Sequence, residues 1–261
     1  MIKGRLNIMF AEERKLKILD SLNKDGKVKV CDLSKFYEVS EVTIRRDLQE
    51  LEEAELIKRV HGGAVLNDNT KFEPTFSEKI DKFYEEKESV GKLAASMILD
   101  GDTIVLDAGT TTLKIVRYIT AKDITVLTNS VDIAFELSKK QNVEVILTGG
   151  TLRWETRALV GPVADNTFKN FKVDKAFIGV NGICIINGLT TPNIIEATTK
   201  KEMIKIAKKI IVVCDHTKFN RVSFAKIVDV DSIDLIITDN GVDAESIEEF
   251  EKKEIKIIKA K

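Results

Sequence analysis

The pattern that most restricts the fold of this chain begins at Thr103, where short β-rich runs start to alternate with helical ones. The runs are near-continuous and rich in Val and Ile: TIVLDAG, ITVLTN and VEVILTGG come first, and KAFIGVNGI, IIVVC and LIITD follow. Strands of this composition are typically buried on both faces. Their alternation with helices predicts an α/β fold, in which helices cover both sides of a mostly parallel sheet.

The chain before residue 67 follows a helical period instead. Gly26 stands just past the first of three predicted helices, and Ser40 is placed to cap the third. LIKRVHGGAVL alternates around Gly62-Gly63 and predicts a hairpin. The polar, aperiodic stretch NDNTKFEPTF indicates a linker, so we expect domains at 9–66 and 77–261 joined by 67–76. The apolar residues predicted to lie on the inner helix faces are Leu16, Leu19 and Leu22 with Ile18 beside Leu22, then Val30, Leu33 and Phe36, then Ile44, Leu48 and Leu51.

Composition limits the partners and the compartment. Lys and Arg number 41 and Asp and Glu 42, so a formal net charge of −1 gives no overall attraction to nucleic acid or to a membrane surface. Any DNA contact must therefore come from a local patch. The 3 cysteines lack paired spacing, which indicates reduced thiols. No run approaches the ~20 apolar residues of a membrane span. The N-terminus lacks a signal-peptide pattern, and we expect a soluble, cytoplasmic protein.

Two short helices joined by the turn EVS and followed by a third helix make a helix-turn-helix arrangement. The N-terminal part of such a third helix enters the major groove of DNA, and the basic hairpin is placed to act as a wing over the adjacent backbone. Helical period alone leaves open a plain three-helix bundle, whose arginines pair with Glu41 and Glu50. The side chains predicted to reach DNA are Thr43, Arg45, Arg46 and Gln49 on the helix and Lys58, Arg59 and His61 on the hairpin.

Three predicted strand ends carry turns that suit an anion: DAGTTT, TNS and TGG, with GVNGI as a fourth. Ligands of parallel α/β sheets lie outside the carboxyl ends of the strands, and the free N–H groups at a helix start bind phosphate. Glycine permits close approach, and threonine hydroxyls donate without adding negative charge. Taken singly, each turn is more often an ordinary βα loop with an N-capping residue, and none is a Walker loop or a GxGxxG fingerprint. The residues of these turns predicted to contact the anion are Gly109, Thr110, Thr111, Thr112, Gly179, Asn181 and Gly182.

The later segments GLTTPNIIEATTKKEM and CDHTKF add charged candidates. A lysine near the phosphate turns, Lys200 or Lys218, would supply a charge-assisted contact, and Glu196 would accept hydrogen bonds from sugar hydroxyls. An exposed helix face with i, i+4 pairs is the alternative for Glu196, Lys200 and Lys201, and a solvated loop is the alternative for Lys218. His216 stands alone, and a lone histidine is more often structural.

VSEVTIRRDLQEL followed by IKRVHGGA resembles the signature of the DeoR family of bacterial transcription regulators over about residues 11–66. One departure is EEAELI, which has Glu55 where the family often has glycine. The remainder resembles the family's sensor domain through DAGTTT, LTNS, LTGG, GVNGI and DHTKF. The resemblance implies a winged helix-turn-helix that reads double-stranded operator DNA, joined to a sensor domain that has a fold like ribose-5-phosphate isomerase and binds phosphorylated sugars.

The resemblance also assigns residues. On the DNA side it places Ser40, Thr43, Arg45 and Arg46 on the recognition helix and Arg59, His61 and Gly62 on the wing. On the sensor side it places Asp107, Gly109 to Thr112, Asn129, Ser130, Gly149, Gly150, Glu196 and Lys218 in or near the effector pocket.

The candidate residues of the second domain also suit an enzyme. A sugar-phosphate isomerase or deaminase would recruit Asp107, Glu196 and Asp215 for proton transfer. The sequence has no metal spacing such as HExxH or paired CxxC, and it carries a DNA reader. We therefore expect a repressor of a sugar or polyol operon that a phosphorylated sugar releases, with no catalytic residue, metal or cofactor. Two-fold operators predict a homodimer or homotetramer, and Arg153 and Arg157 are alternative candidates for a subunit contact. A structural DNA-bridging protein, which needs no ligand, is the third class.

Overall fold

A computed structural model of the 261-residue chain describes residues 10–53, 56–66 and 73–261. The chain divides into two compact units, of which the first ends at residue 72 and the second begins at Glu73. The boundaries 9–66, 67–76 and 77–261 stay predictions, and residues 9, 67–72 and Glu55 lie outside the described residues. The last four residues of the predicted linker, Glu73 to Phe76, belong to the second unit.

The first unit packs three helices against a small antiparallel sheet of order β1-β3-β2. The predicted hairpin is present as β2 and β3, whereas β1 was not predicted. Glycine is needed at position 63, where β3 pairs with β1, because a Cβ there would lie 2.0 Å from the carbonyl oxygen of Val28. The elements are α1 (Ala11–Asp25), β1 (Lys27–Lys29), α2 (Val30–Tyr37), α3 (Glu41–Glu53), β2 (Ile57–Val60) and β3 (Gly63–Leu66).

The inner face of α1 differs from the prediction. Arg14, Ile18 and Leu22 are buried, whereas Leu16 is 55% exposed. The inner face of α1 is rotated relative to the prediction because Arg14 faces inward. Its guanidinium donates two hydrogen bonds to Asp47 of α3, from Nε to Oδ2 at 2.5 Å and from Nη2 to Oδ1 at 3.0 Å. A charged residue on an inner face is invisible to an argument from apolar period.

The inner face of α2 also differs at one position. Phe36, predicted to face inward, is 77% exposed. Tyr37 packs against the core in its place, at i+7 from Val30 and i+4 from Leu33. The inner residues of α3, Ile44, Leu48 and Leu51, are buried as predicted.

The buried pair of Arg14 and Asp47 gives a stability prediction. Asp47→Asn is expected to destabilise the first unit by about 2 kcal/mol, because a buried guanidinium loses its charged acceptor. Urea unfolding followed by helical circular dichroism measures the change. Lys17→Ala, which removes an exposed pair with Glu13, should cost less than about 0.5 kcal/mol. The fluorescence of Trp154, the sole tryptophan and a residue of the second unit, should report an unchanged transition. Equal losses in both variants would contradict the prediction.

The second unit is built on a seven-stranded sheet of order β15-β14-β12-β9-β4-β5-β6, in which every neighbouring pair is parallel. The six predicted strands are all present in it. The chain adds β15, a β7–β8 hairpin and a three-stranded antiparallel sheet β10-β11-β13, which were not predicted. The strands are β4 (Thr103–Leu106), β5 (Ile124–Thr128), β6 (Val143–Leu147), β7 (Thr151–Arg153), β8 (Ala158–Val160), β9 (Val173–Gly179), β10 (Gly182–Cys184), β11 (Gly188–Thr191), β12 (Ala207–Val213), β13 (Ala225–Val228), β14 (Leu235–Thr238) and β15 (Lys256–Lys259).

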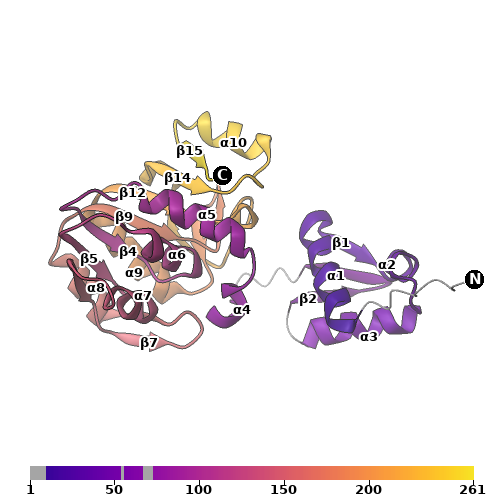
Figure 1. The fold of residues 1–261 in the computed structure, drawn as a ribbon. Helices are drawn as coiled ribbons and strands as arrows, with labels where there is room; N and C mark the ends of the chain where they lie inside the picture. The colour runs from indigo at the N-terminus through magenta and orange to yellow at the C-terminus, as the bar shows by residue number, and fades with distance from the viewer. Residues whose placement is uncertain (1–9, 54–55, 67–72) are drawn as a thin grey trace, which may run out of the picture. The chain divides into compact units, whose positions relative to one another are not determined.

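Helices cover both faces of this sheet (Figure 1). Successive residues of a strand point to opposite faces, and both faces are apolar: Val105 joins one core cluster, while Ile104 and Leu106 join the other. The cluster that contains Ile104 and Leu106 includes residues of α5, α6 and α7. The cluster that contains Val105 includes residues of α8, α9 and α10. The helices are α4 (Phe76–Ile80), α5 (Tyr84–Ala95), α6 (Thr110–Tyr118), α7 (Val131–Leu137), α8 (Pro162–Lys169), α9 (Ile194–Ile206) and α10 (Ala244–Glu251), with short helices η1 (His216–Lys218) and η2 (Val230–Ser232).

The strand order fixes where a ligand can sit. From β4 the chain continues to β5 and β6 on one side, whereas β9, β12, β14 and β15 fill the other side. The order therefore reverses between β4 and β9, and such a switch point opens a crevice at the carboxyl ends of the strands. Among the described residues, no helix is both long and apolar enough to cross a membrane.

Candidate functional site

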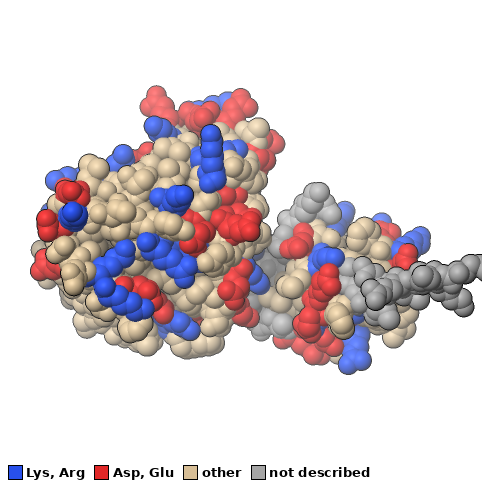
Figure 2. All heavy atoms as spheres, in the orientation of Figure 1, with Lys and Arg blue, Asp and Glu red and all other residues tan. Residues whose placement is uncertain are grey.

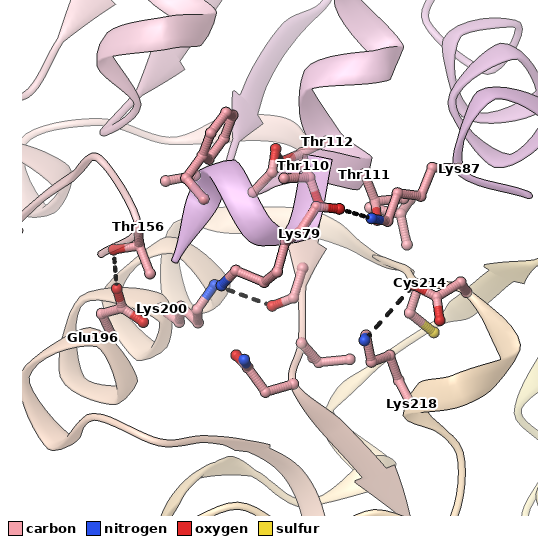
Figure 3. A pocket seen from close by; sticks show the side chains of 18 of the residues that line it. Lys79, Lys87, Thr110, Thr111, Thr112, Thr156, Glu196, Lys200, Cys214 and Lys218 are labelled. Carbon is pink, nitrogen blue, oxygen red and sulfur yellow. Dashed lines mark hydrogen bonds and ion pairs between the residues drawn. The ribbon is translucent and has the colours of Figure 1, made fainter. Parts of the chain in front are cut away.

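A cavity lies at the switch point between β4 and β9. Its empty volume is about 640 Å³, including the space at its mouth. The loops that follow β4, β9 and β12 contribute to its wall, together with α4, α5, α9 and the β7–β8 hairpin. Figure 3 shows its polar side chains around the first turn of α6. The lining residues are Glu73, Phe76, Lys79, Lys87, Ala108, Gly109, Thr110, Thr111, Thr112, Thr156, Gly179, Val180, Asn181, Glu196, Lys200, Val213, Cys214, Asp215 and Lys218.

Helix α6 begins inside this cavity. Gly109 is its N-cap, and Thr110, Thr111 and Thr112 form a buried first turn that contains no acidic residue. The Thr112 hydroxyl donates to the carbonyl of Gly109 at 3.0 Å, whereas the first N–H groups of a helix have no acceptor within the helix. The cavity therefore contains a set of backbone donors at the positive end of a helix dipole.

Four lysines line the same cavity: Lys79, Lys87, Lys200 and Lys218 (Figure 3). Lys87 is 3% exposed and donates to the carbonyls of Lys79 and Lys82, the latter at 2.6 Å. An ammonium group has three protons, so one remains for a ligand. Burial lowers the pKa of Lys87 to about 8, and burial also lowers the pKa of Lys79. These lysines make the α6 end of the cavity suited to a phosphate group.

Lys200 makes the closest ion pair of the four lysines, whereas Lys79 lies 3.6 Å from Glu73 and Lys218 lies 3.8 Å from Asp215. Its Nζ donates to Asp107 Oδ2 and, at 3.0 Å, to the carbonyl of Gly179. Asp107 is 1% exposed and also accepts from the N–H of Gly179 at 2.9 Å. Burial raises the pKa of Asp107, against the attraction of Lys200. The pair thus joins the β4 turn to the β9 turn at the wall of the cavity.

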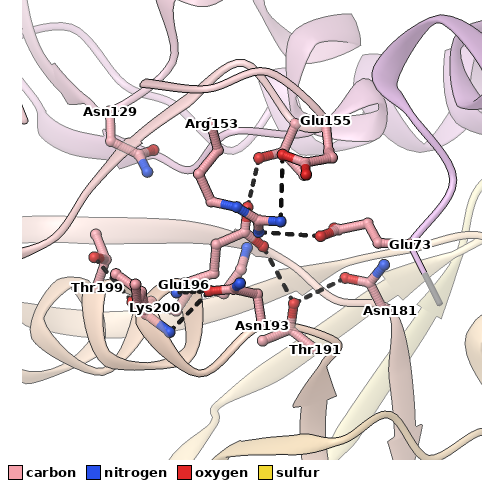
Figure 4. A network of polar contacts seen from close by, with 12 residues as sticks. Glu73, Asn129, Arg153, Glu155, Asn181, Thr191, Asn193, Glu196, Thr199 and Lys200 are labelled. Carbon is pink, nitrogen blue, oxygen red and sulfur yellow. Dashed lines mark hydrogen bonds and ion pairs between the residues drawn. The ribbon is translucent and has the colours of Figure 1, made fainter. Parts of the chain in front are cut away.

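Glu196 enters the cavity from the start of α9. Its Oε1 accepts from the Thr156 hydroxyl at 2.5 Å, and its Oε2 accepts from the Thr191 hydroxyl at 3.3 Å. Nη1 of Arg153 lies 2.9 Å from the same Oε1. Figure 4 shows this network, in which Arg153 stands between Glu196, Glu73 and Glu155. Glu196 is therefore a buried member of a polar cluster, not part of an exposed helix face.

The candidates fall into two groups by position. Gly109, Thr110, Thr111, Thr112, Gly179, Asn181, Glu196 and Lys218 line the cavity, and Asp107 and Asn129 lie against a smaller void beside it. Asn129 accepts from the N–H of Ala108 at 3.0 Å and donates to the carbonyl of Leu159 at 3.1 Å, so it positions the turn. Their roles in binding stay predictions.

Ser130, Gly149, Gly150 and Gly182 line neither of these spaces, and each has a local structural reason, which for Gly149 is a φ of 72°. Ser130 caps α7 by accepting from the N–H of Ile133 at 3.2 Å. Gly150 adopts φ 121°, where a Cβ would also lie 2.8 Å from the carbonyl oxygen of Val160. A Cβ at Gly182 would lie 2.4 Å from the carbonyl oxygen of Arg221.

Sequence reasoning missed Glu73, Lys79, Lys87 and Thr156. Three of them lie in or beside α4 and α5, where a charged residue on a helix is ordinarily solvated. His216, expected to be structural, holds its Nδ1 2.9 Å from Asp239, which raises the pKa of the imidazole. Arg153 is 15% exposed and faces the cavity cluster, while Arg157 contacts Asp132 at 3.1 Å. Within the described ranges, no group of three or more His, Cys, Asp or Glu is arranged to hold a metal ion.

The predicted DNA face of α3 is exposed and starts at a capped turn. Ser40 accepts from the N–H of Thr43 at 3.1 Å. Arg45 pairs with Glu41 at 2.9 Å and Arg46 with Glu50 at 3.2 Å, with the arginine side chains 59% and 81% exposed. Gln49 donates to Glu53 at 2.9 Å. The i, i+4 pairs of the bundle interpretation are thus present, but pairs this exposed contribute little and can exchange for phosphate.

The predicted wing is likewise exposed. Lys58 and Arg59 lie on β2, and His61 and Gly62 form the turn to β3. The N–H of Arg59 donates to Glu52 at 2.8 Å, which anchors the hairpin to the end of α3. Figure 2 shows Lys and Arg interspersed with Asp and Glu on the visible surface, in keeping with the net charge of −1.

Comparison with known proteins now adds the family. The description "DeoR-like helix-turn-helix domain" matches residues 14–70, and "DeoR C terminal sensor domain" matches residues 82–240. The chain is 40% identical to the HTH-type transcriptional regulator GlpR of Haloferax volcanii, over 96% of this chain and 98% of that protein. It is 39% identical to the HTH-type transcriptional repressor GlcR of Bacillus subtilis, over 88% and 89% of the two chains. Among solved structures, ribose 5-phosphate isomerase A of Methanocaldococcus jannaschii matches at 17% identity with a TM-score of 0.37, over 51% of this chain and 53% of that one.

Proposed function

The chain belongs to the DeoR family of transcription regulators, and we propose that it represses a sugar or polyol operon until a phosphorylated sugar binds its second unit. The observation that carries the effector assignment is the first turn of α6, which opens into a cavity beside Lys79, Lys87 and Lys218. The phosphate lies at that turn and accepts hydrogen bonds from the helix N–H groups and the threonine hydroxyls. Lysine ammonium groups then balance its charge.

DNA binding in this proposal uses the first unit. The N-terminal part of α3 enters the major groove, with Thr43, Arg45, Arg46 and Gln49 toward the bases and phosphates, while Ser40 fixes the start of the helix. Lys58, Arg59, His61 and Gly62 lie over the neighbouring backbone. Two-fold operator sites require two copies, so the regulator acts as a homodimer or homotetramer in the cytoplasm. Regulation requires an effector that changes operator affinity by about 5–150-fold.

A sensor without turnover is the better account of the cavity. A general base needs a free carboxylate next to the substrate carbon. Asp107 is paired with Lys200, Glu196 with Arg153, and Asp215 accepts from the N–H of Thr217 at 3.1 Å to cap η1. Asp107 and Glu196 each hold a close cationic partner and Oδ1 of Asp215 caps a short helix, while Oδ2 of Asp215 lies 3.8 Å from Lys218; these contacts support binding over proton transfer. Steady conversion of a sugar phosphate by the full-length protein would favour the enzyme instead.

A thermal-shift panel tests the effector assignment. Fructose 1-phosphate, tagatose phosphate, deoxyribose phosphate and glycerol phosphate are each added to the full-length protein, with the unphosphorylated sugars as controls. A true effector at 100 times its Kd stabilises the folded protein by about 2.7 kcal/mol, and it should also release the operator in a gel-shift assay. A ligand that raises Tm without affecting the operator would separate binding from regulation and contradict the proposal.

Lys87 gives the pH dependence of effector binding. A lysine with a lowered pKa is charged below that value and neutral above it, and the pKa of Lys87 is about 8. A phosphate monoester, with a second pKa of about 6, stays a dianion over this range. Affinity should therefore hold between pH 7 and 7.5 and fall by about tenfold by pH 9. Calorimetric titration checks this: Lys87→Met should remove the fall, whereas Lys140→Met, at a residue that does not line the cavity, should retain it. A fall that persists in Lys87→Met would assign it to another group.

A further inference from the structure

Part of the cavity wall comes from a segment that neither family description covers. The helix-turn-helix match ends at residue 70 and the sensor match begins at residue 82. Glu73, Phe76 and Lys79 nevertheless line the cavity, and Glu73 is the first residue of the second unit. Residues that directly follow the DNA-binding unit in the sequence therefore complete the candidate ligand site.

Glu73 is a buried carboxylate in this wall. Its side chain is only 5% exposed, with Oε2 3.0 Å from Nη1 of Arg153 and Oε1 3.6 Å from Nζ of Lys79. These contacts match its charge, but their geometry leaves both carboxylate oxygens without a hydrogen-bond donor in the described part of the chain. Burial, and then the nearby charge of Glu196, raise the pKa of Glu73. Buried acceptors without donors are costly, so this carboxylate is arranged to receive them.

The surroundings of Glu73 indicate which kind of donor fits. Arg153 faces three carboxylates, with Glu196 at 2.9 Å, Glu73 at 3.0 Å and Glu155 at 3.5 Å (Figure 4). Arg153 and Lys79 bring two positive charges against these three acids, so this part of the cavity disfavours an anion. Hydroxyl groups, which donate without charge, suit it. The start of α6 and the lysines beside it suit an anion instead. The cavity therefore matches a molecule with a phosphate on one part and hydroxyls on another.

We propose that Glu73 is a specificity-determining residue, whose carboxylate accepts hydrogen bonds from the hydroxyls of a sugar phosphate bound with its phosphate at α6. This inference rests on the proposed function and extends it to a residue outside both matched ranges. The sugar also holds the segment 73–80 in place. That segment is also attached through the N–H of Phe76, which donates to the carbonyl of Glu155 at 2.6 Å, through the buried side chain of Phe76, and through Lys87, which donates to the carbonyl of Lys79. It is stiffened by the capping box of Thr75 and Glu78. Ligand binding in the cavity thereby orders the segment that follows the DNA-binding unit in the sequence.

The test compares two glutamates that contact the same arginine. Full-length wild type, Glu73→Gln and Glu155→Gln are titrated with inorganic phosphate and with fructose 1-phosphate, tagatose phosphate, deoxyribose phosphate and glycerol phosphate. Glu73→Gln should bind the wild type's tightest sugar phosphate about tenfold more weakly, since a charged acceptor becomes a neutral one, and should bind inorganic phosphate within twofold of wild type. Glu155→Gln removes a carboxylate from Arg153 but does not line the cavity, so it should change neither affinity.

Hydrogen exchange supplies a second readout. In wild type, amides of residues 73–80 should exchange more slowly with the tightest sugar phosphate than with inorganic phosphate. Equal losses for both ligands in Glu73→Gln would assign the residue a structural role, and an unchanged sugar-phosphate affinity would exclude any contact; either result overturns the inference. Wild type that binds inorganic phosphate as tightly as every sugar phosphate keeps the phosphate site and overturns the role of Glu73. Wild type that binds no phosphate compound overturns the proposed function and this inference with it.

Discussion

Replacing Arg45 and Arg46 together with alanine is expected to weaken operator binding about a thousandfold. Both guanidinium groups lie on the exposed face of α3, within two helical turns of its capped start. A good arginine contact to a base edge contributes roughly 1–3 kcal/mol, so two such contacts lose about 4 kcal/mol. Their partner Glu41 is exposed, and the half-buried Glu50 keeps its pair with Lys15 at 2.9 Å, so the substitution leaves no unpaired buried charge and the fold should be retained. Gel shift on duplexes selected by the wild type from a random pool measures the loss.

The single variants separate two kinds of contact. An arginine that reads a base should, when lost, relax the selected sequence at one position. An arginine on a phosphate should weaken all sequences alike and lower the salt slope of binding by about 1. Lys17→Ala, an exposed residue of α1 paired with Glu13, is the matched control and should leave operator affinity unchanged. If the double variant bound the operator as tightly as wild type, α3 would not be a recognition helix. Its arginines would then be solvated ion-pair partners in a plain three-helix bundle.

The sequence predicted the parallel sheet because both faces of its strands are apolar. Ile104, Val105 and Leu106 are all fully buried, although they alternate between two core clusters. A run without polar interruption is the direct signature of that burial. The α6 turn was found for a similar reason, since glycine and three threonines between a strand and a helix leave few other structures. Where the local sequence determines the environment, prediction succeeded.

The missing parts of the site depend on distant contacts. Lys87 lies on a helix, where lysine is usually solvated, and its burial becomes apparent only when the carbonyls of Lys79 in α4 and of Lys82 just after α4 are placed against it. Glu73 lies in a polar stretch that resembles a linker, and Arg153, seated on an unpredicted hairpin, draws it inside. Gly149 and Gly150 show the converse: positive φ angles explain both glycines without a ligand. Charged residues matched by partners far along the chain leave no local pattern to detect.

Thr111→Asp is expected to abolish effector binding while leaving the fold intact. The residue is 9% exposed in the first turn of α6 and lines the cavity. An acid in a first turn favours the helix by about 0.3–1 kcal/mol, so thermal stability should hold or rise slightly. The same charge opposes a bound phosphate: two unit charges about 5 Å apart repel by about 3 kcal/mol at an effective dielectric constant of 20. Effector affinity should therefore fall at least about 100-fold, as measured by calorimetric titration.

The operator response then follows from the lost affinity. Since the first unit is unchanged, Thr111→Asp should bind the operator as wild type does, yet stay bound at effector concentrations that release wild type. Thr111→Asn has nearly the shape of the aspartate variant without its charge, so it should lose no more than about tenfold in effector affinity, the scale of one hydrogen bond. Equal effector affinity in wild type and both variants would place the phosphate elsewhere in the cavity. Equal, large losses in both variants would make the defect steric, because only the charged residue should exclude the anion from the start of α6.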